Sequence, residues 1–109
     1  MDNPLLKNLL DFYEEDPHDP FNIYALALEY RKTDIGKAEA LFRKLLAEHP
    51  DYLAAYYHAA QLFGEVGKSE EAHATYQKGI ELAQQQGNTK THQELVRAYR
   101  MFQDEEEEW

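Results

Sequence analysis

Residues 25–50, ALALEYRKTDIGKAEALFRKLLAEHP, decide the fold of this chain. Apolar side chains recur there every three or four positions on both sides of a short polar turn, which is the pattern of two helices that each bury one face. The stretch AAQLFGEVGKSEEAHATYQKG at residues 59–79 has the same pattern. The sequence therefore predicts a pair of helices that occurs twice.

The two copies of this helix pair are in a fixed register. Tyr30 and Phe63 are 33 positions apart, and Phe42 and Tyr76 are 34 positions apart. The change from 33 to 34 indicates one residue fewer in the first turn than in the second. The equivalent small residues follow the same two spacings: Ala27 and Ala60, then Ala38 and Ala72.

Helical periodicity extends over nearly the whole chain, and residues that begin or end helices interrupt it. A capping side chain precedes a proline at Asn3-Pro4 and Asp19-Pro20, and Gly67 and Gly87 suit left-handed helix ends. The other predicted N-terminal caps are Asp34, Asp51, Ser69 and either Thr91 or Thr89. The predicted helices cover residues 4–15, 20–32, 35–48, 52–65, 69–86 and 89–103.

A helix–turn–helix period of 34 residues, with small and aromatic residues at these positions and a closing proline, resembles the tetratricopeptide repeat (TPR) family. The chain departs from the family pattern at Ile23, where Trp is frequent, at Leu45, where a small residue is usual, and at Gln84, which replaces a proline. The resemblance implies an all-α array of helical hairpins with about six helices. It is carried by Leu26, Ala27, Tyr30, Ala38, Phe42 and Pro50 in the first copy, and by Tyr56, Ala60, Phe63, Gly67, Ala72, Tyr76 and Gly79 in the second.

The ends of the chain extend the repeat and set the expected domain organisation. We expect one TPR-like domain over residues 1–103, followed by an acidic tail at residues 104–109. Such a run of like charge is expected to be solvated and frayed, although the tail could instead occupy a groove of its own or a neighbouring molecule. The expected parts of the domain are a half-repeat at 4–17, repeats at 20–50 and 51–87, and a capping helix at 89–103.

Composition narrows the class of function. A net charge of −10 argues against nucleic acid or an anionic membrane as the main partner, because both are polyanions. A chain without cysteine has no thiolate nucleophile and no Cys-based zinc site. No apolar run approaches the ~20 residues that cross a bilayer, and the acidic start lacks the basic residues of a signal peptide. We expect a cytoplasmic protein.

Motifs for catalysis or for a bound group are also missing from the sequence. None of the five histidines is three or four residues from another, which is the spacing that places two metal ligands on one helix face. No glycine-rich phosphate loop is present, and Ser69 is the only serine. We therefore expect no enzyme activity, no cofactor and no metal.

The resemblance implies a binding surface, because the first helix of each repeat lines the concave groove of the family, where ligands usually bind. On this chain the predicted groove is aromatic in its middle and basic at its edges. As alternatives, Arg97 and Arg100 pair with Glu94 or Asp104, and Tyr24 and Tyr57 pack against a neighbouring helix. The candidate partner-binding residues are Phe21, Tyr24, Leu28, Arg31, Tyr57, His58, Gln61, Lys90, Arg97 and Arg100.

The expected function is a non-catalytic protein–protein interaction module that binds a peptide or a partner protein in this groove. The basic side chains favour an acidic segment or a C-terminal carboxylate as the ligand. The alternative is a structural homo-oligomer or assembly subunit that self-associates through apolar terminal helices, such as the one that carries Leu5, Leu6, Leu9 and Leu10.

The repeat register makes a prediction about packing. Ala60 is expected at a close contact between helices, so Ala60→Leu should overpack the core and lower the free energy of unfolding by about 1–3 kcal/mol. Thermal or urea unfolding of the variant measures this change. An unaltered melting temperature would contradict the proposed register of the two repeats.

Overall fold

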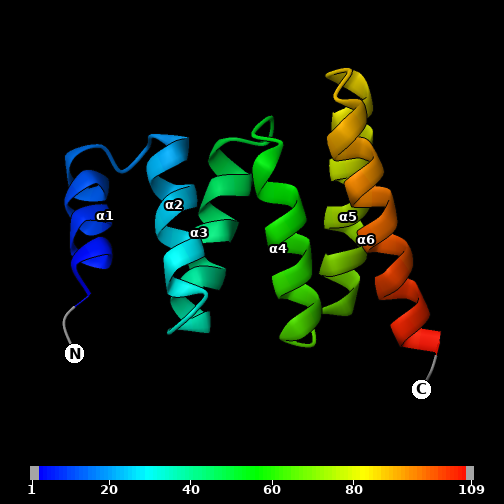
Figure 1. Cartoon of the computed structure of the whole chain (residues 1–109), viewed down its shortest axis with the longest axis horizontal. Helices are drawn as coiled ribbons and strands as arrows, with labels where there is room; N and C mark the ends of the chain where they lie inside the picture. The colour runs from blue at the N-terminus through cyan, green and yellow to red at the C-terminus, as the bar shows by residue number, and fades with distance from the viewer. Residues whose placement is uncertain (1–2, 108–109) are drawn as a thin grey trace. The chain divides into compact units, whose positions relative to one another are not determined.

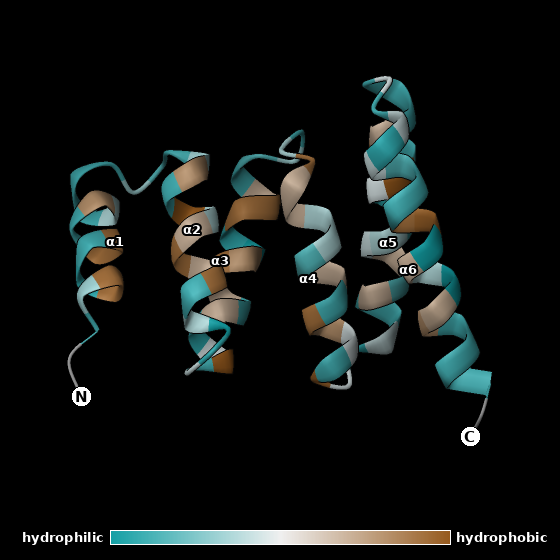
Figure 2. Cartoon of the chain, viewed as in Figure 1, coloured by the Kyte–Doolittle hydropathy of each residue, from teal (hydrophilic) through white to brown (hydrophobic). Residues whose placement is uncertain are grey.

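The computed structural model describes residues 3–107, and every regular element in that range is a helix (Figure 1). The predicted all-α class is therefore confirmed. Figure 2 shows hydrophobic positions as bands that alternate with hydrophilic ones along the helices, in keeping with the predicted one-sided burial. The six helices are α1 (Pro4–Glu15), α2 (Pro20–Tyr30), α3 (Ile35–Glu48), α4 (Ala54–Glu65), α5 (Ser69–Gln85) and α6 (Thr89–Glu107).

These helices form two compact units. The N-terminal unit, Met1–Ala55, contains α1, α2 and α3, and the C-terminal unit, Tyr56–Trp109, contains most of α4 with α5 and α6. Most helix boundaries agree with the predicted ones to within two residues. The exception is α6, which was expected to end near residue 103 and continues through Glu107.

The N-terminal unit has its core between α2 and α3. Ile23 of α2 and Leu45 of α3 are fully buried and share a cluster with Ala55. Ala27 and Ala38 are also fully buried, which agrees with their predicted role as small contact residues. In contrast, α1 contributes no buried residue.

The C-terminal unit depends on a close approach of α4 and α5. A Cβ atom at Gly79 would lie 2.7 Å from Cβ of Tyr56 and 3.2 Å from Cδ1 of Leu95. Tyr56 and Leu95 are themselves buried, so neither can move away easily. Only glycine at position 79 therefore fits among these three helices.

Glycines also end two helices of this unit in the predicted way. Gly67 and Gly87 have φ angles of +81° and +69°, a region that other residues rarely adopt. After Gly67, the Lys68 N–H donates to the Phe63 carbonyl at 2.8 Å, and after Gly87, the Asn88 N–H donates to the Ala83 carbonyl at 2.9 Å. Both ends are Schellman motifs, which pair carbonyls that the helix leaves free.

Three predicted N-terminal caps are confirmed. The side chains of Asn3, Asp19 and Asp34 accept hydrogen bonds from backbone N–H groups in the first turns of α1, α2 and α3. Asp51 was also predicted to cap a helix, but α4 begins only at Ala54.

Two other predicted caps are wrong. Ser69 is the first residue of α5, because the Lys68 carbonyl accepts the first helical bond from the Ala72 N–H, and no side chain caps this helix. At α6, Asn88 Oδ1 accepts from the Thr91 N–H at 3.0 Å, so neither threonine is the cap. Asn88 directly follows the left-handed Gly87, and the tight turn places it one residue before the new helix.

The glycine contact yields a test of the C-terminal unit. Gly79→Ala should lower the free energy of unfolding by about 1–2 kcal/mol, because the overpacking cost exceeds the roughly 1 kcal/mol that alanine gains over glycine in a helix. Urea unfolding measures the change. Gly36→Ala in the first turn of α3 is the matched control, since a Cβ there would meet only Asp34 Oδ1 at 3.6 Å. Equal effects at both sites would contradict the close approach at Gly79.

Candidate functional site

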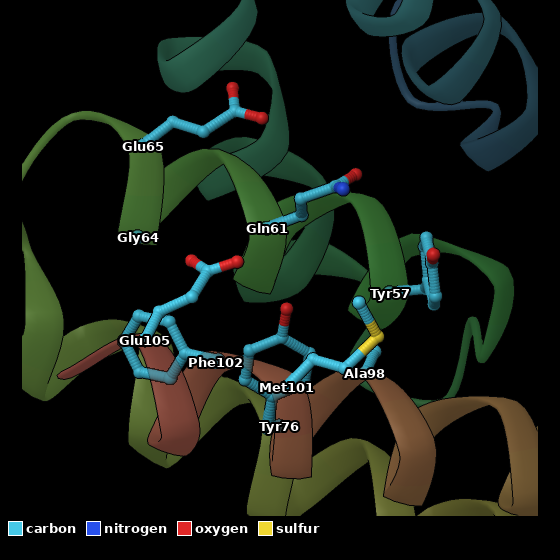
Figure 3. Close-up of a pocket in the computed structure, with 9 residues that line it drawn as sticks. All are labelled: Tyr57, Gln61, Gly64, Glu65, Tyr76, Ala98, Met101, Phe102 and Glu105. Atoms are coloured by element: carbon cyan, nitrogen blue, oxygen red, sulfur yellow. The ribbon is translucent and has the colours of Figure 1, made fainter. Parts of the chain in front are cut away.

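The C-terminal unit contains a pocket of about 250 Å³ (Figure 3). Residues of α4 and α6 form its two sides, and one residue of α5 closes it from below. Its lining consists of Tyr57, Gln61, Gly64 and Glu65 from α4, Tyr76 from α5, and Ala98, Met101, Phe102 and Glu105 from α6.

Helical spacing brings these side chains together. On each of the two helices the lining positions are three or four residues apart, so they share one face. Gly64 controls how closely the faces meet, because a Cβ atom there would lie 2.9 Å from Cε1 of Phe102. The Phe102 ring therefore lies directly against the α4 backbone and borders the pocket at that point.

The floor of the pocket is aromatic and fixed. Tyr76 is 4% exposed, and its ring stacks on Tyr99 with centroids 5.3 Å apart and lies 5.7 Å from the Phe102 ring. At the rim, Met101 is 58% exposed. Tyr57 is half-buried, with its ring 5.3 Å from His58 in an edge-to-face arrangement. The pocket thus presents a rigid floor and an exposed apolar rim.

The charged side chains that line the pocket are both acidic. Glu65 and Glu105 lie at the same end, near Gly64 and Phe102, and Tyr57 lies at the opposite end with Met101 (Figure 3). No lysine, arginine or histidine is among the lining residues. The electrostatic character of this site is therefore negative.

The predicted basic residues lie elsewhere on α6. Lys90, Arg97 and Arg100 are exposed, and none of them lines the pocket. Arg100 is two positions from both Ala98 and Phe102, or roughly 200° around the helix axis, so it lies on another face. Within residues 3–107 these three side chains make no ion pair, so the alternative pairing with Glu94 or Asp104 is absent there.

Of the ten candidate residues, Tyr57 and Gln61 line the pocket, and His58 contacts Tyr57. The sequence identifies Tyr76 as a position of the repeat pattern and predicts no binding role for Phe102, Met101 or Glu105. The four-residue spacing of Met101 and Glu105 places both on one face of α6, but the predicted helix ends at residue 103, before Glu105.

Four candidates belong to the N-terminal unit. Phe21 is 62% exposed, whereas Leu28 of α2 and Arg31, which follows the last residue of α2, are half-buried. The Tyr24 ring packs against Tyr52, in the loop before α4, with centroids 5.6 Å apart. Burial, with a smaller effect of Tyr52, raises the pKa of the Tyr24 hydroxyl above its usual value.

The last turns of α6 are attached to α5 through His73. Its Nδ1 atom lies 2.9 Å from the Tyr99 hydroxyl, and its Nε2 atom lies 2.6 Å from Oε1 of Glu106. The prediction of a frayed tail is therefore wrong for residues 104–107, which are helical although their side chains are exposed. Residues 108 and 109 of the predicted tail lie outside the described range.

Residues 3–107 contain neither a metal-binding cluster nor a helix that could cross a membrane. No group of three or more histidine, aspartate or glutamate side chains within that range is arranged to hold a metal ion. Within the same range, every helix is too short or too polar to cross a membrane.

Comparison with known proteins identifies relatives of the chain. The tetratricopeptide repeat family matches residues 30–91. The crystal structure of a tetratricopeptide repeat domain protein from Salinibacter ruber is 39% identical, with a TM-score of 0.74, over 79% of this chain and 97% of that one. The solution structure of a Salinibacter ruber tetratricopeptide repeat domain protein is 41% identical, with a TM-score of 0.74, over 80% of this chain and 89% of that one.

A protein from Bordetella parapertussis has a TM-score of 0.79 over 96% of this chain and 91% of that one. Its identity is 19%, so the likeness concerns the fold alone. No curated protein sequence matches the chain.

The contact of His73 with Glu106 predicts a local effect. Glu106→Ala should speed amide hydrogen exchange in residues 103–107 about two- to fivefold, because the pair is only partly exposed and holds the last turn. The global melting temperature should change little. Glu107→Ala is the matched control. It also removes an acidic side chain from the C-terminal end of the helix, where the helix dipole makes a negative charge unfavourable. Equal exchange in both variants would show that Glu106 does not hold the helix end.

Proposed function

The chain belongs to the tetratricopeptide repeat family, and we propose that it is a non-catalytic module that binds a peptide segment of another protein at the pocket between α4 and α6. Proteins of this family generally bind other proteins or peptides. The pocket is the feature of the C-terminal unit to which such a segment would bind.

The observation that carries this proposal is the exposure of Met101 at the rim of an aromatic pocket. A methionine that is 58% exposed leaves apolar surface in water, and covering such a side chain is favourable by about 1.5–3 kcal/mol at most. Methionine and aromatic residues are enriched at protein interfaces, and Tyr57 and Phe102 adjoin Met101 here. The aromatic side chains and the methionine of the lining are thus residue types that interfaces favour.

The dimensions favour a peptide over a compact small molecule. The lining residues of α6 extend from Ala98 to Glu105, or about 10 Å along the helix axis. About three residues of an extended chain have that length. A volume of about 250 Å³ is below the ~300–1,000 Å³ that is usual for small-molecule sites. One or two side chains of a bound segment would fill it.

The charge along α6 bears on the orientation of the ligand. Lys90 and Arg97 lie in the first half of this helix together with Glu94, and Arg100 lies in its second half, ahead of the acidic run that begins at Asp104. The exposed basic side chains support the predicted preference for an acidic group or a C-terminal carboxylate, but only along the part of the helix before Asp104. A segment lying along α6 would therefore be charged oppositely at its two ends.

A second candidate is self-association through α1. Leu5 and Phe12 are 52% and 54% exposed, and α1 buries no residue. The N-terminal unit also has a largely apolar pocket of about 270 Å³ that includes Leu10, Tyr13 and Leu41. Light scattering at several concentrations measures whether the chain forms a dimer. A dimer that Leu5→Asp disrupts would support self-association through α1.

The binding proposal is tested by selecting random twelve-residue peptides displayed on phage against the full chain. Enriched peptides should bind the Tyr57→Ala/Met101→Ala variant at least about tenfold more weakly, because central aromatic and apolar contacts dominate interfaces. Leu5→Ala is the matched control for an exposed apolar side chain, and circular dichroism confirms that each variant is folded. Unchanged affinity in the double variant would place the binding site elsewhere.

A further inference from the structure

We propose that the pocket between α4 and α6 selects an arginine side chain of the bound segment. This inference rests on the proposed function and specifies the chemistry of the ligand at that same site. The carboxylates at one end of the pocket would contact the guanidinium group, and the aromatic side chains would pack against its methylene stem.

The first support is the sign of the charge. Glu65 and Glu105 extend from facing helices at the same end of the pocket (Figure 3). Glu105 makes no ion pair with any residue in the range 3–107. Two acidic groups without a basic group in the lining favour a cationic ligand and disfavour an anionic one.

The second support is the aromatic lining. The faces of aromatic rings attract cations, and arginine makes such contacts more often than lysine does. Tyr57 and Phe102 flank the hollow, and Tyr76 closes its floor. A long side chain with an apolar stem and a charged head can satisfy the rings and the carboxylates together.

Arginine fits this combination better than lysine. Its planar guanidinium group stacks on rings and can donate two parallel hydrogen bonds to one carboxylate. Both carboxylates of the pocket are on exposed residues, so water screens each contact. The selectivity should therefore be several-fold for each carboxylate and should weaken with salt.

The test uses three short peptides that differ only in their central residue, which is arginine, citrulline or glutamate. Citrulline has nearly the shape of arginine without its charge. Titration into the ¹⁵N-labelled full chain should shift the amides of Glu65, Met101 and Glu105 with the arginine peptide. Its affinity should be at least about fivefold higher than that of the citrulline peptide, and the glutamate peptide should bind most weakly.

Substitutions in the pocket assign the selectivity to its carboxylates. Glu65→Gln/Glu105→Gln should lower the affinity of the arginine peptide to that of the citrulline peptide, and Glu105→Gln alone should have an intermediate effect. The matched control is Glu70→Gln/Glu81→Gln, which removes two exposed acids of α5 that do not line the pocket. It should leave the affinity unchanged.

The outcomes distinguish this inference from the proposed function. If the citrulline peptide, or a phage-selected peptide without arginine, binds at Met101 as tightly as the arginine peptide, the inference is wrong and the binding function stands. If neither the three peptides nor any selected peptide shifts the pocket amides, both are wrong. If the arginine preference persists in Glu65→Gln/Glu105→Gln, the carboxylates do not cause it.

Discussion

The C-terminal unit depends on the contact of Gly79 with Tyr56. Because Gly79 has no Cβ atom, α4 and α5 can approach closely there, and Leu95 of α6 packs on the same point. This arrangement fixes Tyr76, one turn earlier on α5, as the floor of the pocket. The location of the candidate site is thus a consequence of helix packing, and its chemistry comes from the side chains around it.

Much of the fold could be predicted from the sequence, because it is encoded locally. Helical periodicity and capping residues such as Asn3 and Asp34 depend on neighbours within a few positions, and the structure confirms them. The small residues at helix contacts were identified from their recurrence after 33 or 34 residues. The prediction of the α6 cap was wrong because one residue serves two helices. Asn88 completes the Schellman motif after α5 and also caps α6.

The candidate site was predicted less completely, because it depends on contacts between residues distant in sequence. A run of like charge is expected to be solvated and frayed, so the sequence predicts that α6 ends before Asp104. The helix instead continues through Glu107, His73 contacts Tyr99 and Glu106, and Glu105 lines the pocket. Glu65 of α4 and Glu105 of α6 together make the pocket negative, and composition alone does not place them side by side.

The contact of Gly64 with Phe102 has a consequence for the divergence of this protein and its relatives. Here the missing methyl group lets an aromatic ring lie against the opposite helix, and the ring is a side chain, not backbone, at this contact. An alanine at position 64 would displace the ring and reshape the pocket, while the helix would keep its own hydrogen bonds. The shape of the pocket can therefore change by a single methyl group while the repeat architecture is retained.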